Sequence, residues 1–242
     1  MRPEITLKQF RVLVFDVYGT LADWETGIFQ AIRPTLERAS SPWTKEEALL
    51  AFTSVEKDLQ VQHPEMPYNE LLGMVYHAFS ERLGVHTTPE EDRAFGSSIA
   101  QWPVFPDTVA ALAILRKYYK IVVLSNVDNN SFDAFTRKAL EPNADAPIFD
   151  LVITAQDIGS YKPDPANFKF ALNAIKGKLD IDEEGVLFTA QSLFHDHKPV
   201  NALGLHSAWI AREGAIMGMD ADATYDFKFD TLMDMAKARE SQ

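Results

Sequence analysis

The sequence predicts an α/β fold, with a doubly wound, mostly parallel sheet core and a helical domain inserted after the first strand. Between residues 21 and 106 only helix signals occur, whereas strand and helix signals alternate from there to the C-terminus. Four short apolar runs that lead into polar residues indicate buried parallel strands, at 11–15, 121–124, 151–153 and 185–188. We therefore expect a Rossmann-like core over residues 1–22 and 104–242, and a helical cap domain over 23–103.

The first predicted strand leads directly into a carboxylate. Asp16 is followed by a glycine turn at Gly19 and by the hydroxyl of Thr20. Open α/β sheets bind ligands at the carboxyl ends of their strands, which places Asp16 at the mouth of a site. A carboxylate held there by free N–H groups and a hydroxyl can attack an electrophile and form an ester. On this segment alone, an aspartate that serves only the turn and caps the next helix has about equal weight.

Helix signals define the inserted region. Thr44 begins a capping box, and Thr88 begins a second one with Pro89 at the first helical position. Between them, apolar residues recur at helical spacing until Gly84, namely Leu71, Leu72, Val75, Phe79 and Leu83. A helical insertion directly after a nucleophile loop is typical of a lid, which excludes water and selects the substrate.

The later strand ends carry complementary groups. Ser125 and Asn126 follow the second strand and offer a hydroxyl and an amide to an anionic group. Lys162 follows the third strand and lies just before a helix that starts with proline. Asp196 follows the fourth strand, between two histidines. Together with Asp16 these segments supply a nucleophile, a hydroxyl, a cation and an acid.

The C-terminal segment predicts one further strand and a helix. Residues 225–230 alternate between aromatic and polar side chains, which indicates a short edge strand. Asp230 or Thr231 then caps a terminal helix.

This order of motifs resembles the haloacid dehalogenase superfamily, and residues 15–21, FDVYGTL, look most like its 2-haloacid dehalogenase branch. The resemblance covers essentially the whole chain, and the four strand-end motifs carry it. It implies that Asp16 attacks the substrate to give an aspartyl ester or an aspartyl phosphate, which water then hydrolyses. It also implies that Lys162 steadies the charge of the nucleophile and that Ser125 with Asn126 receives a carboxylate or phosphate.

The position two residues after the nucleophile separates the two chemistries of the superfamily. The phosphatases have a second aspartate there, a general acid for the leaving alkoxide, and this chain has Tyr18. Loss of such an acid would slow ester hydrolysis by about 10²–10⁴-fold, but a halide needs no proton to leave. Tyr18 therefore favours a hydrolase that uses Asp16 to displace halide from a small 2-halo carboxylic acid.

The last motif leaves the role of Asp196 open. In the dehalogenases the matching acid helps orient or activate the hydrolytic water, and in the phosphatases it helps hold Mg²⁺. Gln191 stands where the phosphatases carry an aspartate, so Asp16 and Asp196 alone would hold Mg²⁺ weakly. We therefore expect no cofactor, with Mg²⁺ as the alternative, and place Tyr18, Thr20 and Gln191 at the substrate with the Ser-Asn pair.

The histidines beside Asp196 have no counterpart in the dehalogenase pattern. His195 can act as the base for the water that opens the ester, because its pKa falls in the working range. The alternative is a histidine that packs at a helix start. We expect His197 at the surface, because only one of two such neighbours can point into a site.

Two features of the cap stay open. The dehalogenases use a cap arginine at the leaving halide, and Arg33 and Arg38 are the nearest candidates. Trp24, Phe29 or Trp102 would suit the apolar part of a small substrate if they lined the pocket.

Composition limits the classes of function. With 242 residues and 46% hydrophobic content, the chain can bury one core and a small second domain. It has no cysteine, no apolar stretch near the roughly 20 residues of a membrane helix, and no signal segment, so we expect a cytoplasmic enzyme. A net charge of −12 opposes nucleic-acid binding. The expected partner is a small anionic substrate, and the resemblance allows a homodimer. The alternatives are a Mg²⁺-dependent phosphatase and a non-catalytic relative that binds a metabolite.

Overall fold

A computed structural model describes residues 5–143, 147–219 and 222–242. Its centre is a six-stranded sheet with the order β3-β2-β1-β4-β5-β6, in which all neighbours run parallel. The strands are β1 (Val12–Phe15), β2 (Lys120–Ser125), β3 (Leu151–Thr154), β4 (Val186–Ala190), β5 (Ser207–Ile210) and β6 (Phe227–Phe229). The prediction of a doubly wound parallel α/β sheet is confirmed, and β6 is an edge strand as expected.

The strand order reverses between β1 and β4. The chain runs outward from β1 through β2 to β3, and then returns to the other side of β1 with β4. Phe15, the last residue of β1, is in register with Val123 of β2 and Thr189 of β4. Ligand sites of open α/β sheets lie in the crevice at such a switch point. Asp16, the residue after β1, therefore lies at this crevice.

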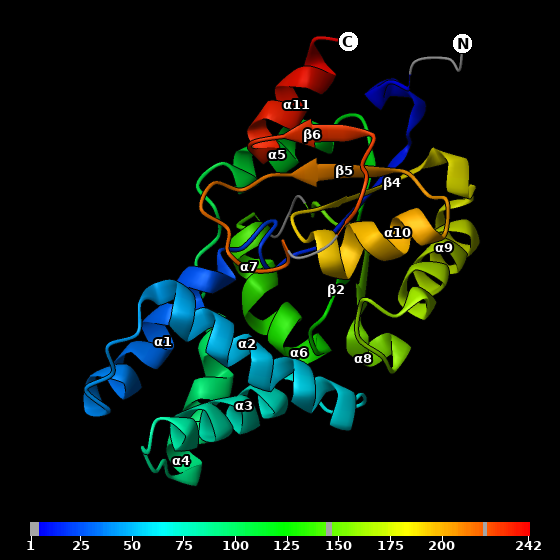
Figure 1. The fold of residues 1–242 in the computed structure, drawn as a ribbon. Coiled ribbons are helices and arrows are strands. Elements are labelled where there is room, and N and C mark those ends of the chain that lie inside the picture. Colours follow the sequence, from blue (N-terminus) through cyan, green and yellow to red (C-terminus); the bar gives the residue numbers. More distant parts are fainter. Residues whose placement is uncertain (1–4, 144–146, 220–221) are drawn as a thin grey trace.

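The sheet is buried on both faces, as the continuous apolar runs predict. All four residues of β1 are buried, and alternate side chains enter different cores. Leu13 and Phe15 belong to a cluster that includes side chains of α5 and α11, whereas Val12 and Val14 pack with α9 and α10. Helices therefore cover both faces (Figure 1).

The helices around the sheet follow the predicted alternation. They are α5 (Thr108–Leu115), α6 (Asn129–Ser131), α7 (Arg137–Leu140), α8 (Ala155–Ile158), α9 (Pro165–Leu179), α10 (Lys198–Ala202) and α11 (Leu232–Glu240). Shorter helical turns are η1 (Leu7–Gln9), η2 (Ser97–Gln101), η3 (Phe132–Thr136), η4 (Glu183–Gly185) and η5 (Leu193–His197). Pro165 is the first residue of α9, and Thr231 caps α11 with a capping box, both as predicted. None of the described helices has the length and apolar character needed to cross a membrane.

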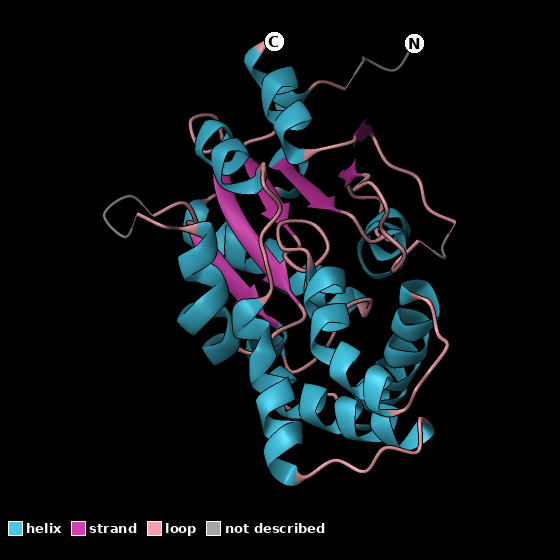
Figure 2. Cartoon of the chain, turned by 90° about the vertical axis from the view of Figure 1, so that its left-hand side faces the viewer, coloured by secondary structure: helices cyan, strands magenta, loops and turns pink. Residues whose placement is uncertain are grey.

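Four helices lie between β1 and α5. They are α1 (Trp24–Arg38), α2 (Lys45–Gln62), α3 (Tyr68–Arg82) and α4 (Pro89–Gly96), and we call them the helical region. They gather at one end of the molecule, beyond the sheet (Figures 1 and 2). The capping boxes at Thr44 and Thr88 are confirmed. The division into a cap over 23–103 and a core stays a prediction.

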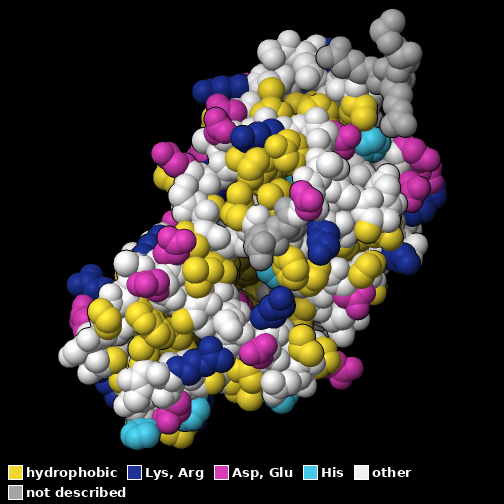
Figure 3. Space-filling model, viewed as in Figure 1, with side chains coloured by type: hydrophobic (Ala, Val, Ile, Leu, Met, Phe, Trp, Pro, Cys, Tyr) yellow, Lys and Arg dark blue, Asp and Glu magenta, His cyan; other side chains and the backbone are white. Residues whose placement is uncertain are grey.

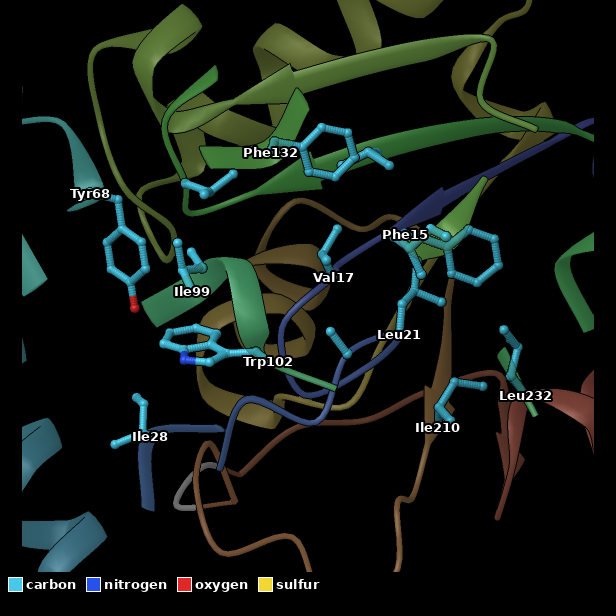
Figure 4. Close-up of a cluster of buried hydrophobic side chains, with 14 of the residues drawn as sticks. Phe15, Val17, Leu21, Ile28, Tyr68, Ile99, Trp102, Phe132, Ile210 and Leu232 are labelled. Atoms are coloured by element: carbon cyan, nitrogen blue, oxygen red, sulfur yellow. The ribbon is translucent and has the colours of Figure 1, made fainter. Parts of the chain in front are cut away.

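A buried cluster joins the helical region to the sheet. Trp102 packs edge-on against Tyr18, with ring centroids 5.4 Å apart, and lies near Ile28 and Ile99 (Figure 4). A Cβ at Gly27 of α1 would come within 2.3 Å of the Trp102 ring, so this close approach requires glycine. Trp102 is therefore a packing residue at the base of the helical region.

Candidate active site

The carboxylate of Asp16 is held on both oxygens. Its backbone N–H donates to the carbonyl of Thr189 in β4 over 3.1 Å, which continues the strand pairing past Phe15. Oδ1 accepts a hydrogen bond from Lys162 Nζ at 2.8 Å, and Oδ2 accepts one from Thr20 Oγ1 at 2.7 Å. The side chain is 9% exposed. These contacts fix the carboxylate in one orientation at the switch point of the sheet.

The turn after Asp16 positions the nucleophile. Gly19 has a φ of +100°, which favours glycine. Thr20 Oγ1 donates to Asp16 and accepts from the backbone N–H of Gln191 at 2.9 Å. Its hydroxyl is therefore engaged inside the protein, and we assign Thr20 to orienting Asp16 rather than to the substrate contact expected from the sequence.

Arg212 binds the backbone of the same turn through the carbonyl oxygen of Thr20. The sequence did not indicate this residue. Its Nε and Nη2 donate to the carbonyl oxygen of Thr20 at 3.0 and 2.8 Å, and its Nη1 donates to Asp107 at 2.7 Å. The residue follows β5, and an isolated arginine there carries no motif that would identify it.

Lys162 joins the two acidic residues of the predicted site. Its Nζ donates to Asp16 Oδ1 at 2.8 Å, to Asp196 Oδ1 at 2.7 Å and to the carbonyl of Leu124 at 3.1 Å. The Lys162 side chain is 2% exposed. Burial alone would lower the pKa of Lys162, but the two carboxylates raise it above its ordinary value. The lysine therefore stays charged, with its three protons engaged.

Asn126 fixes the backbone that carries this lysine. Its Oδ1 accepts from the Lys162 N–H at 2.7 Å, and its Nδ2 donates to the Lys162 carbonyl at 3.0 Å. Asn126 also lines the cavity described below. The neighbouring Ser125 is buried, and its Oγ has no hydrogen-bond partner among the described residues.

Asp196 has one engaged and one free oxygen. Its Oδ1 accepts from Lys162, whereas Oδ2 is buried without a hydrogen-bond partner in the described part of the chain. Burial and the charge of Asp16 raise the pKa of Asp196 to about 7, although Lys162 opposes the shift. A carboxyl with this pKa can accept and return a proton near neutral pH.

His195 faces the same cavity and is neutral near pH 7. Its Nδ1 lies 3.1 Å from Ser192 Oγ, which also accepts from the His195 N–H at 3.0 Å. Burial and the Lys162 ammonium lower the pKa of His195 to about 4, and Lys57 adds to this shift. The ring therefore binds protons weakly.

The prediction of a surface position for His197 is wrong. The side chain is buried, with Nδ1 2.9 Å from Ser207 Oγ and Nε2 3.0 Å from the Ala190 carbonyl. Residues two apart on a helical turn point in nearly opposite directions. His195 accordingly faces the cavity, and the opposite side of η5 is covered by β5 instead of solvent.

A cavity of about 580 Å³ opens above these groups. Its described lining includes every predicted site residue except Thr20 and Ser125. The predicted site residues in this lining are Asp16, Tyr18, Asn126, Lys162, Gln191, His195 and Asp196. Of the three aromatic candidates, Trp24 is part of this lining, whereas Phe29 and Trp102 are not. In Figure 3 the surface is hollowed where the helical region meets the rest of the molecule.

Two lining residues use their polar groups within the protein. The hydroxyl of Tyr18 lies 2.8 Å from Thr136 Oγ1, and burial raises its pKa above the ordinary range. Gln191 Nε2 donates to the Met217 carbonyl at 3.0 Å. Both side chains therefore shape the cavity wall.

The helical region contributes polar groups that the sequence reasoning missed. Glu56 and Lys57 of α2 line the cavity with Tyr68 of α3. Tyr68 donates from its hydroxyl to Glu56 Oε1 at 2.6 Å, and burial raises the pKa of Glu56 to about 7. No motif marks these residues, because only the packing of α2 against α3 brings them together.

The two arginine candidates lie elsewhere. Arg33 pairs with Glu37 and Arg38 with Glu91, each at 2.8 Å on the exposed surface of the helical region. Neither belongs to the described lining of the cavity. Lys57 is the cationic side chain that the helical region contributes to this lining.

The residues around Asp16 would offer a divalent cation two carboxylates, Asp16 and Asp196. Among the residues that the structure describes, no three or more carboxylate, histidine or cysteine side chains gather in a group able to hold a metal. Of the four carboxylate oxygens of Asp16 and Asp196, three accept hydrogen bonds from Lys162 or Thr20. Of these four oxygens, only Asp196 Oδ2 accepts no hydrogen bond in the described structure, so Mg²⁺ held here would take most of its near-octahedral set of oxygens from water or substrate.

Comparison with known proteins decides the family. The family model of haloacid dehalogenase-like hydrolases matches residues 10–188. The chain belongs to this hydrolase family. The hydrolase is 24% identical to (S)-2-haloacid dehalogenase 4A of Burkholderia cepacia over 210 residues, 84% of each chain. It is 29% identical over 223 residues to haloacid dehalogenase-like hydrolase domain-containing protein 3 of Mus musculus, covering 84% of this chain and 82% of that protein.

The fold of the hydrolase matches solved dehalogenases. The structure of L-2-haloacid dehalogenase from Xanthobacter autotrophicus superposes with a TM-score of 0.74 at 19% identity, covering 96% of this chain and 99% of that one. Within the family, the hydrolase resembles the 2-haloacid dehalogenase branch.

Proposed function

We propose that this hydrolase displaces halide from small 2-halo carboxylic acids, with Asp16 as the nucleophile. One observation carries the proposal: Asp16 is oriented by Lys162 and Thr20, while the position of a leaving-group acid holds Tyr18. The Tyr18 hydroxyl is engaged by Thr136, and its raised pKa makes it a weak acid. A halide leaves without a proton, so this arrangement suits carbon–halogen displacement better than ester hydrolysis.

The first step forms a covalent ester. A carboxylate oxygen of Asp16 bonds to C2 of the substrate, and the carbon–halogen bond breaks with its electron pair on the halide. The ammonium of Lys162 lies 2.8 Å from Oδ1 and compensates the charge of the Asp16 carboxylate before the attack.

The second step hydrolyses the ester. Water attacks Cγ of Asp16, and we assign its proton to Asp196, whose Oδ2 is free and whose pKa is about 7. Asp196 returns this proton to the leaving 2-hydroxy acid as the bond between Cγ and the oxygen on C2 breaks. The Asp16 carboxyl left by this step releases its proton to solvent and is again a carboxylate. The His195 side chain, with its pKa of about 4, is a weaker base and is assigned to the cavity wall.

Halide release tests the proposal. The purified hydrolase is incubated with both enantiomers of 2-chloropropionate and with chloroacetate, in chelator without added metal, beside the Asp16→Asn variant. Release by the wild type and none by the variant supports the proposal. Failure of all three compounds, with turnover of phosphate esters in Mg²⁺, would favour the phosphatase alternative. Failure of both series would favour a binding protein.

A further inference from the structure

The cavity is large for a three-carbon acid. Its volume of about 580 Å³ lies within the range of about 300–1,000 Å³ typical of pockets for drug-sized ligands. Asp16, Lys162 and Asp196 occupy the sheet side of this space, and α2 forms the opposite wall. A substrate that reached Asp16 alone would leave the α2 wall uncontacted.

The α2 wall is mainly polar. Leu50, Thr53, Ser54 and Lys57 all line the cavity, and their spacing of three, four and seven residues puts them on one face of the helix. At about 1.5 Å per residue this face is about 10 Å long. The opposite face of α2, which includes Phe52, packs inside the helical region. The polar face is therefore available to a ligand.

Lys57 brings a cation to the α2 side of the cavity. Its ammonium lies 5.1 Å from the centroid of the Phe194 ring, and it makes no ion pair among the described residues. The ammonium of Lys162, in contrast, is shared between two carboxylates. The chain has a net charge of −12, which repels anions overall. An anionic group at the cavity therefore needs a local cation, and the exposed ammonium of Lys57 supplies one.

Two carboxyl groups of α2 flank this lysine. Glu56 accepts the hydrogen bond of Tyr68, while Asp58 also lines the cavity and is exposed. Phe194 presents an apolar ring beneath the ammonium. The combination of the Lys57 cation, the Phe194 ring and the hydroxyl of Ser54 suits the carboxylate end of a carbon chain.

We propose that Lys57 and Phe194 form a second subsite, for an anionic group at the far end of a substrate longer than 2-chloropropionate. The inference rests on the proposed function and narrows its substrate class to 2-halo acids that carry a second carboxylate, such as 2-chloroadipate. Asp16 reacts at one end of this substrate, and Lys57 pairs with the carboxylate at the other end.

Binding of unreactive acids tests the subsite without chemistry. Calorimetry compares adipate with hexanoate, two acids of equal length, on the wild type, on Lys57→Met and on Lys198→Met. Lys198 is the matched control, because its ammonium flanks the same Phe194 ring at 5.9 Å but is not part of the described cavity lining. We expect adipate to bind about fivefold more tightly than hexanoate to the wild type and to Lys198→Met, and equally to Lys57→Met.

Three results would overturn the subsite. They are equal binding of the two acids by the wild type, a preference for adipate that survives in Lys57→Met, and a loss of hexanoate binding in Lys57→Met as large as that of adipate. The last result would mean that Lys57 contacts the single carboxylate. Halide release from 2-chloropropionate by the same preparation tests the proposed function separately, because adipate binding does not depend on turnover.

Discussion

The ammonium of Lys162 lies 2.7 Å from the carboxylate of Asp196, whose other oxygen has no hydrogen-bond partner in the described structure. The same ammonium lies 2.8 Å from Asp16. The buried Lys162 ammonium therefore compensates the charges of two buried carboxylates, Asp16 and Asp196, which have different roles in the proposed mechanism. Asp16 is oriented as the nucleophile, while Asp196 has a pKa of about 7 and can exchange a proton.

Replacing Lys162 by methionine should destabilise the protein as well as inactivate it. The change leaves two buried carboxylates without their cation, which costs about 3–5 kcal/mol for a broken buried pair. Protonation of these carboxyls at low pH removes the uncompensated charge. Urea unfolding at pH 8 and pH 5 should therefore show a larger loss of stability at pH 8, and equal losses at both pH values would contradict the account.

The pH dependence of turnover should report Asp196. Its folded-state pKa of about 7 lies above the ordinary value of about 3.9, so its protonated form stabilises the fold below about pH 4 and this contribution is lost as the pH rises through about 7. The ionised form accepts the water proton, so kcat should rise with pH through an acid limb. Because the ester removes the Asp16 charge that helps raise the pKa of Asp196, this limb should lie below pH 7.

Two variants separate Asp196 from His195 in this profile. Asp196→Asn should accumulate the ester on Asp16, detected as an added substrate mass on the intact protein. His195→Gln should keep the acid limb at the pH of the wild type. An acid limb that disappears in His195→Gln would show that the histidine is the base.

Thr20→Val should lower kcat and leave substrate binding nearly unchanged. The variant removes the hydrogen bonds to Asp16 Oδ2 and from the Gln191 N–H, and Thr20 is not part of the described lining of the cavity. We expect a loss of about 10–100-fold, since a misoriented nucleophile loses much of the advantage of positioning. Steady-state kinetics with Thr20→Ser, which keeps the hydroxyl, should recover most of the rate. A loss confined to KM would instead indicate a contact with substrate.

Gly218→Ala should disturb the cavity wall at Ser192. Gly218 has a φ of +74°, and a Cβ there would lie 2.4 Å from Ser192 Oγ, the partner of His195. Gly204 is the control, because its φ is +72° and nothing lies within 4 Å of its Cβ position. Chemical unfolding should show Gly218→Ala less stable than Gly204→Ala by about 1–3 kcal/mol, the cost of overpacking. Equal stabilities would mean that Ser192 moves aside freely.

The sheet and its strand-end residues could be predicted because local sequence encodes them. Buried parallel strands read as apolar runs, and their carboxyl ends converge on one edge, so Asp16 and Lys162 were expected together although they lie far apart in the chain. The cavity wall contributed by α2 could not be predicted. Lys57 faces the site because of how α2 packs on α3, and helical periodicity alone does not say which polar residue will border a cavity.

The positions of Thr20 and His197 show a second limit. Sequence motifs indicate which residues gather at a site, but the direction of each side chain depends on contacts from distant strands. Thr20 is turned inward by the Gln191 N–H, and His197 is covered by β5 through Ser207. Neither partner adjoins its residue in a recognisable motif.

Single turnover in water enriched in heavy oxygen tests the central claim most directly. With enzyme in excess over 2-chloropropionate, the account predicts that heavy oxygen enters the Asp16 carboxylate, because water attacks Cγ of the ester, and that the first 2-hydroxy acid released carries ordinary oxygen. Mass spectrometry of the peptide that contains Asp16 measures this. Heavy oxygen found in the product, with Asp16 unlabelled, would show that water displaces the halide directly and would contradict a covalent role for Asp16.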